Sequence, residues 1–165
     1  MTSPGRKAQR TAKWAHTMTK WAISYATGGK RPGFRTVKTW QIVAFPGGKG
    51  SESRGVVDFL AIRRDHKTDH GKIRSGDLLE IILVQVKGGT ARDPTSADVA
   101  RLKEVQRHHG ARAVVLADWK KGQGVTFRIL KRNSWVKTTE SQVFGLEAHE
   151  HLDPAPNIRR RPRRP

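Results

Sequence analysis

Cysteine is absent from this chain of 165 residues. Its absence excludes disulfide bonds, a thiol nucleophile and zinc sites with cysteine ligands, and it is typical of a reducing compartment. Long apolar runs are missing too. No segment approaches the roughly 18–20 apolar residues that cross a bilayer, and the N-terminus lacks the apolar region of a secretory signal. We therefore expect a soluble protein with no membrane segment.

Acidic residues are scarce, with 14 Asp and Glu against 33 Lys and Arg, which gives a formal net charge of +19. None lies between Met1 and Ser51. Such an excess of one sign repels itself unless a polyanion neutralises it, and nucleic acid is the commonest such partner. The composition predicts a nucleic acid as the partner, and we expect DNA, with RNA as an alternative. A ribosome-associated or chromatin-like packing protein would fit the composition about equally well.

The length suits a single domain with a full core. We expect this domain to span residues 11–147, after a disordered basic N-terminus over residues 1–10. A basic tail over residues 148–165 ends in an Arg/Pro run that cannot build a core and is predicted to bind phosphates through Arg159, Arg160 and Arg161. We expect a cytoplasmic or nucleoid-associated protein. In a eukaryote we expect a nuclear one, because nuclear localisation signals have the same composition as this tail.

Two apolar runs of strand length form the centre of the predicted fold, Gly55–Ile62 and Leu78–Gly89. Both are rich in β-branched and aliphatic residues and are bounded by Gly, Ser and charged residues. The polar segment between them, residues 63–77, predicts a hairpin with a long loop.

The other elements follow from periodicity and end signals. Trp14, Met18, Trp21 and Tyr25 fall at helical spacing from Thr11 onward, and we expect this aromatic stripe to pack on the core. Further strands are predicted at 37–45, 113–117 and 125–130, with a small edge element after Lys131. A helix begins after Pro94, with Thr95 and Asp98 as a capping-box pair, and ends at Gly110. Because this helix crosses between them, the strands before and after it should be parallel. The predicted fold class is α/β, with a mixed central sheet flanked by helices.

Polar residues interrupt the two central strands where apolar ones would be expected. Asp58 is the one acid in its strand, and Gln85 and Lys87 interrupt the row that Leu79, Ile81 and Leu83 begin. Buried polar groups need partners, so Asp58 is expected to meet Gln85 and Lys87 across the hairpin.

An Asp on one strand and Gln-x-Lys at the end of the next, followed by Gly-Gly and a helix, resembles the PD-(D/E)XK nuclease superfamily. The pattern is most similar to its Gln-containing branch, as in Mrr-type restriction enzymes, and to Holliday-junction resolvases. The resemblance covers roughly residues 36–130 and implies a restriction-endonuclease-like core with catalytic Asp58, Gln85 and Lys87.

The resemblance also implies a metal site and a reaction. Asp58, the amide oxygen of Gln85 and the backbone carbonyl of Val86 would bind Mg²⁺, for which Mn²⁺ could substitute. Lys87 would orient or help to deprotonate the attacking water and steady the scissile phosphate. The expected function is metal-dependent DNA hydrolysis, potentially selective for structures such as junctions.

Basic side chains near this site are predicted to face DNA. They lie in the glycine-rich turn after the first strand and in the hairpin loop, and are Lys49, Arg63, Arg64, Lys72 and Arg74. His66, Asp69 and His70 in the same loop form only a weak metal-site pattern, and a solvated loop is the favoured interpretation.

Two alternatives stay open. Asp58 and Lys87 could form an ion pair at a strand end, in which case the chain would be a non-catalytic basic nucleic-acid-binding protein that retains a nuclease-like fold. If the chain does cut both strands of a duplex, a symmetric homodimer would supply two sites.

Overall fold

The structure is a computed structural model that describes residues 4–26, 40–45, 56–65 and 70–145. Within these ranges six strands form one sheet in the order β1-β2-β3-β4-β5-β6. The pair β3 and β4 is parallel and all other neighbours are antiparallel. The elements are α1 (Pro4–Ala26), β1 (Gln41–Ala44), β2 (Phe59–Asp65), β3 (Leu78–Gly88), α2 (Ser96–His109), β4 (Ala113–Lys120), β5 (Gly124–Lys131), β6 (Ser134–Thr138) and α3 (Glu140–Phe144).

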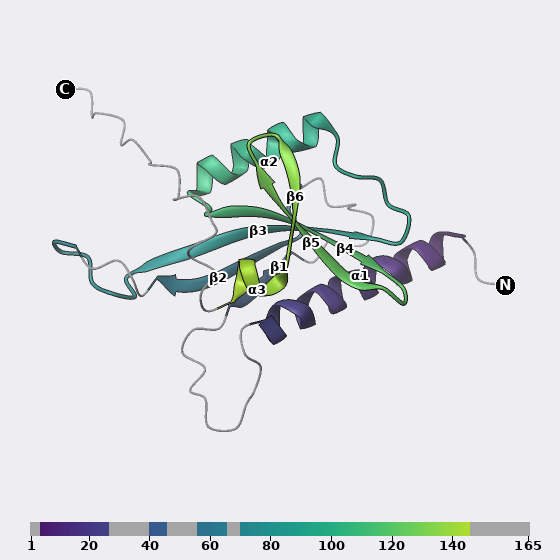
Figure 1. Ribbon diagram of the computed structural model, residues 1–165, viewed down its shortest axis with the longest axis horizontal. Coiled ribbons are helices and arrows are strands. Elements are labelled where there is room, and N and C mark those ends of the chain that lie inside the picture. The colour runs from purple at the N-terminus through teal and green to yellow at the C-terminus, as the bar shows by residue number, and fades with distance from the viewer. Residues whose placement is uncertain (1–3, 27–39, 46–55, 66–69, 146–165) are drawn as a thin grey trace, which may run out of the picture.

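The helices cover the two faces of this sheet. Figure 1 shows α2 over one face, with α1 and α3 over the other. The prediction of an α/β fold with a mixed central sheet is confirmed, as is the parallel pairing across the α2 crossover. The predicted edge element after Lys131 is present as β6 and α3. No helix in the described ranges is both long enough and apolar enough to span a membrane.

Strand β3 lies at the centre of the core because its middle is buried on both sides. Ile82 and Val84 belong to the cluster under α1 and α3, together with Phe59 and Phe127. Leu83 belongs to the cluster under α2. The continuous apolar run that predicted a buried strand therefore supplies side chains to both halves of the core.

Helix α2 begins and ends where its sequence signals predicted. The Thr95 side chain accepts a hydrogen bond from the Asp98 N–H, and the Asp98 carboxylate accepts one from the Thr95 N–H, which completes a capping box. Gly110 adopts the left-handed conformation with φ of 60°, which a glycine adopts without a steric cost.

The prediction for the first helix was wrong in two respects. The helix begins at Pro4, so residues 4–10, expected to be disordered, are helical. Proline is well placed in a first turn, and the Arg, Lys, Ala and Gln that follow are good helix formers. The aromatic stripe also faces away from the core, because Trp14, Trp21 and Tyr25 are 45%, 54% and 76% exposed.

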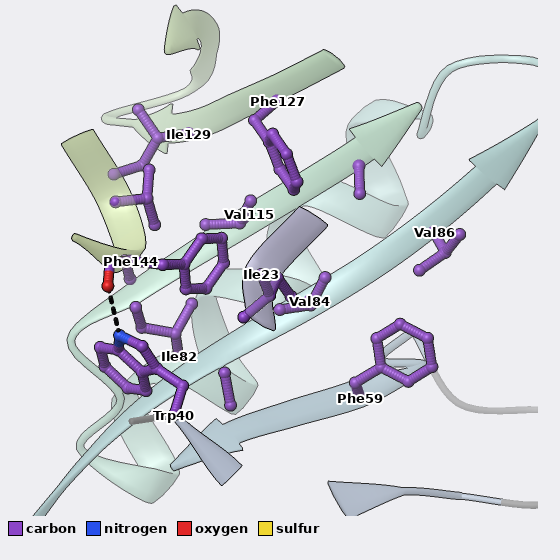
Figure 2. Packing of buried hydrophobic residues seen from close by; sticks show 14 of the residues in the cluster. Ile23, Trp40, Phe59, Ile82, Val84, Val86, Val115, Phe127, Ile129 and Phe144 are labelled. Atoms are coloured by element: carbon purple, nitrogen blue, oxygen red, sulfur yellow. Dashed lines mark hydrogen bonds between the residues drawn. The ribbon is translucent and has the colours of Figure 1, made fainter. Parts of the chain in front are cut away.

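The buried side of α1 consists of small residues and one isoleucine. Ala15, Thr19 and Ile23 are almost fully buried. The sheet face beneath them already carries large rings, such as Phe59 and Phe127 (Figure 2), which leaves little room for an indole. A Cβ added at Gly88 would lie only 2.9 Å from the Ala15 Cβ, so helix and strand approach each other closely here. Small side chains are therefore what this interface admits.

Trp40 anchors the other end of this face. Its indole N–H donates a 2.9 Å hydrogen bond to the carbonyl of Phe144 in α3, drawn in Figure 2. The two rings pack edge to face at 5.9 Å. The strand predicted over 37–45 is observed over Gln41–Ala44, and residues 37–39 lie outside the described ranges.

Candidate functional site

The candidate site begins at Asp58, which directly precedes β2. Its backbone N–H donates a 3.0 Å hydrogen bond to the carbonyl of Val84. Its side-chain Oδ2 accepts a 2.7 Å hydrogen bond from the N–H of Val86. The carboxylate oxygen therefore accepts the hydrogen bond that a backbone carbonyl would accept from Val86 if the β2–β3 ladder continued.

This bond also locates the carbonyl of Val86. In an antiparallel pair the N–H and C=O of one residue point to the same neighbouring strand. Because the Val86 N–H points to Asp58, the Val86 carbonyl faces the same end of the ladder. The Asp58 carboxylate and the Val86 carbonyl thus lie on the same edge of β3, near its C-terminal end.

Gln85 adds an oxygen that lacks a protein partner. Its side chain is 8% exposed, and its Oε1 is buried with no hydrogen-bond partner. An unpaired buried amide oxygen costs free energy, which a water, an ion or a ligand at this place would recover.

Lys87 lies two residues further along the same row of β3. Strand alternation places Gln85 and Lys87 on the side of the sheet that faces α2. The Asp58 carboxylate instead bonds the Val86 N–H at the edge of β3 and lies beside His16 of α1. The three side chains thus lie at one end of the sheet without sharing one face. The Lys87 ammonium is near enough to act on the Asp58 carboxyl group electrostatically.

Helix α1 contributes two residues to the site that the sequence analysis did not identify. The Nε2 of His16 lies 3.8 Å from the Asp58 Oδ1, and its ring packs edge to face on Phe59 at 4.9 Å. The ammonium of Lys20 lies 5.3 Å from the centre of the Phe59 ring. The sequence analysis placed the aromatic stripe of this helix on the core, which would turn His16 and Lys20 away from the sheet. Because that orientation was wrong, neither residue was predicted to lie near Asp58.

Burial shifts the ionisation of both members of the Asp58–His16 pair. It raises the pKa of Asp58, and the Val86 N–H, His16 and Lys87 oppose that rise in decreasing order. Burial also lowers the pKa of His16, against the favourable charge of Asp58 and with a further lowering by Lys20. Both groups are thus pushed toward their neutral forms, because desolvation outweighs the attraction between their charges.

The oxygen atoms at this end of the sheet suit a hard divalent cation. Asp58 supplies an anionic oxygen, and Gln85 and the Val86 carbonyl supply neutral ones. The buried, unpaired Oε1 of Gln85 and the raised pKa of Asp58 would both be relieved by a bound cation. No cluster of three or more His, Cys, Asp or Glu side chains that could hold a metal occurs in the described part of the chain. Any such site therefore relies on amide and backbone oxygens.

The residues predicted to face DNA have different surroundings. Arg64, Lys72 and Arg74 are exposed. Arg63 is 7% exposed because it lies in β2, where its Nε donates a 2.6 Å hydrogen bond to Glu80 and its guanidinium packs on Trp40. Arg63 is therefore a core residue, and the prediction that it contacts DNA was wrong. The remaining predicted contacts fall outside the described ranges and are Lys49, Arg159, Arg160 and Arg161.

The weak metal pattern in the hairpin loop falls mostly outside those ranges as well. His66 and Asp69 are not described, and His70 is exposed and pairs with Ile73 through two backbone hydrogen bonds of 3.0 Å.

A separate cavity of about 980 Å³ lies between α2 and the β5–β6 hairpin. Its lining includes Val99, Lys103, Leu130, Arg132 and Trp135. Asp58, Gln85 and Lys87 are not part of the lining, so this cavity and the candidate site are different places.

Comparison of the chain with known proteins finds no matching family model, no similar curated protein and no similar solved structure.

Proposed function

We propose that this protein is a metal-dependent DNA endonuclease with its active site at the C-terminal end of β3. The observation that carries the proposal is the group of oxygen atoms there. The Asp58 carboxylate is bonded to the Val86 N–H, and the amide oxygen of the adjacent Gln85 is buried and unpaired. A purely structural cluster would be expected to pair that oxygen.

The order of the elements supports the same proposal. The described chain has a leading helix, three antiparallel strands, a crossover helix and a parallel strand. The motif's resemblance to PD-(D/E)XK nucleases implies a core with elements in this order. Asp58 directly precedes the second strand, and Gln85 and Lys87 lie near the end of the third. The net charge of +19 favours a polyanionic substrate.

Each residue has a role that its chemistry allows. Asp58, Gln85 and the Val86 carbonyl would hold Mg²⁺ or Mn²⁺, which when bound would offset the charge that grows on the phosphoryl oxygens. Lys87 would hold the scissile phosphate and orient the attacking water as its proton leaves. His16 would position the Asp58 carboxylate from the side of α1.

The test is cleavage of end-labelled duplex, single-stranded, flap and four-way-junction DNA with Mg²⁺, Mn²⁺ or EDTA. We expect metal-dependent cleavage by the parent. Asp58→Ala and Lys87→Ala should each lower the rate by about 100-fold or more, which is typical when a proton-transfer or charge-stabilising group is lost.

Lys137→Ala is the matched control, because Lys137 is an exposed lysine on β6, on the opposite edge of the sheet from β1 and β2. It should cleave like the parent. Equal activity of Lys87→Ala and Lys137→Ala would contradict the proposal.

A second candidate is a nucleic-acid-binding protein without catalysis. It is favoured by the position of Lys87 on the side of the sheet that faces α2, away from His16. There Lys87 lies in register with Asp118 and acts electrostatically on Asp93 and Asp98. Tight binding of the same substrates with no cleavage under any metal condition would support this candidate.

A further inference from the structure

The outward face of α1 exposes three large aromatic side chains. Trp14, Trp21 and Tyr25 are 45%, 54% and 76% exposed and, at spacings of seven and four residues, lie along one side of the helix. We call them the α1 aromatic row. Single exposed apolar residues are common, but a row of rings on one element is typical of an interaction surface.

The row cannot be explained by packing within the described part of the chain. The opposite side of α1 already packs on the sheet through Ala15, Thr19 and Ile23. That contact leaves no space for an indole, because Ala15 approaches Gly88 closely. The core therefore determines the orientation of α1, and the rings remain available to a partner.

The charge on α1 indicates which partner it is. The helix carries five cations and no acid, namely Arg6, Lys7, Arg10, Lys13 and Lys20. Lys7 lies two helical turns before Trp14, and Arg10 lies one turn before it. Both are exposed, so basic groups extend the aromatic row toward the N-terminus of the helix. A partner that suits the whole face must offer flat rings and negative charge together.

Single-stranded DNA offers both. Unpaired bases stack on aromatic side chains whatever their sequence, while a basic surface follows the phosphates. The helical rise separates Trp21 from Tyr25 by about 6 Å along the axis and Trp14 from Trp21 by about 10 Å. The first interval is close to the thickness of one base stacked on both sides, about 7 Å, because stacked bases repeat every 3.4 Å or so.

Two other occupants fit the face less well. A second copy of α1 would bring five cations against five with no acid between them. An inserted membrane helix would be expected to add aliphatic side chains, yet the isoleucine of α1 is buried against the sheet.

The position of α1 connects this face to the candidate site. The same helix places His16 beside Asp58 on its inner side. DNA bound along the outer side would therefore lie one helix diameter, about 10 Å, from the proposed centre.

We propose that the α1 aromatic row binds single-stranded DNA, with Trp21 and Tyr25 stacking on unpaired bases and the basic N-terminal half of α1 contacting the phosphates. The choice of DNA rests on the proposed function, whereas the stacking surface rests on exposure and charge.

The test measures binding without cleavage. Fluorescence anisotropy of a labelled single-stranded 20-mer and of a blunt duplex of the same sequence is recorded with the full chain in EDTA. We expect Trp21→Ala and Tyr25→Ala each to weaken single-strand binding by about tenfold, as is usual when a stacking ring is removed. Duplex binding should change less than about twofold, because paired bases cannot stack on the row.

Three matched variants control the result. Trp21→Phe keeps a ring and should restore most of the affinity. Val136→Ala removes an exposed apolar side chain from β6 and should bind like the parent. Lys137→Ala removes an exposed lysine from β6 and should also bind the single strand like the parent. The EDTA in the assay makes the measurement independent of catalysis.

Several outcomes would overturn the inference. They are equal weakening of single-strand and duplex binding in Trp21→Ala, no weakening in either, and tighter ring-dependent binding of the matching RNA. Ring-dependent binding to phosphatidylserine vesicles or ring-dependent dimerisation in sedimentation, with DNA binding unchanged, would identify another occupant. If the row binds as expected but nothing is cleaved, the proposed function fails while this inference stands.

Discussion

Glu80 holds two guanidinium groups at the end of β3 that lies away from Asp58. Its Oε2 accepts a 2.6 Å hydrogen bond from the Arg63 Nε, and its Oε1 accepts one of 3.1 Å from Arg112. The three side chains are only 6–12% exposed. This cluster ties β2 to β3 and to the start of β4.

We expect Glu80→Ala to lower the free energy of unfolding by about 3–5 kcal/mol, because it would leave two buried cations without their shared partner. Urea denaturation monitored by circular dichroism measures this. Glu104→Ala is the control, because Glu104 pairs with Arg107 on the exposed side of α2 and solvent screens that pair. Similar losses in the two variants would contradict a buried, cooperative cluster.

The role of Arg63 could not be predicted from its neighbours in the chain. In the sequence it stands beside Arg64 in a polar run, which is typical of a loop that faces DNA. Its partner Glu80 lies 17 residues away and meets it only through the β2–β3 register. The orphaned oxygen of Gln85 was likewise beyond prediction, although the type and position of Asp58, Gln85 and Lys87 were identifiable from the strand pattern.

Among the elements, α2 shows how far local signals reach. Thr95, Asp98 and Gly110 predicted both ends of the helix because capping depends on contacts within a few residues. The same capping box makes a pH prediction. Hydrogen bonds from the Thr95 N–H and then from its hydroxyl lower the pKa of Asp98.

A carboxylate with a lowered pKa stabilises the folded state above its unfolded pKa, near 3.8, and that contribution is lost as the pH falls through its folded value. We expect Asp98→Asn to be less stable than the parent at pH 6 and the difference to disappear as the pH is lowered below 3.8. Urea denaturation from pH 6 to pH 2.5 measures this. A difference that persists or grows at the acid end would contradict it.

Helix α1 shows where local signals fail. Its aromatic spacing predicted a helix correctly, but spacing alone does not say which side of a helix is buried. Ala15 lies against the sheet because Gly88 leaves room there only for a small side chain. That information lies in strands far along the chain, and without it His16 and Lys20 were not identifiable as neighbours of Asp58.

At the scale of the whole molecule, charge and fold point to one class of partner. The excess of basic residues favours a polyanion, and the sheet places a carboxylate, an unpaired amide oxygen and a lysine at one end. Helix α1 lies between this end of the sheet and the proposed stacking surface. Cleavage and single-strand binding can therefore be tested separately, with variants at Asp58 and Lys87 for cleavage and at Trp21 and Tyr25 for single-strand binding.

The central claim is that Asp58, Gln85 and Lys87 act as one metal-dependent site, and Gln85→Glu tests it most directly. The measurement is the cleavage rate as a function of Mg²⁺ concentration for the parent and this variant, with thermal unfolding as the check that both are folded. A carboxylate in place of the amide adds an anionic ligand, so we predict a Mg²⁺ concentration for half-maximal cleavage that is at least severalfold lower in Gln85→Glu. An unchanged Mg²⁺ requirement in a folded, active variant would contradict the claim, because it would show that the side chain at position 85 does not face the metal.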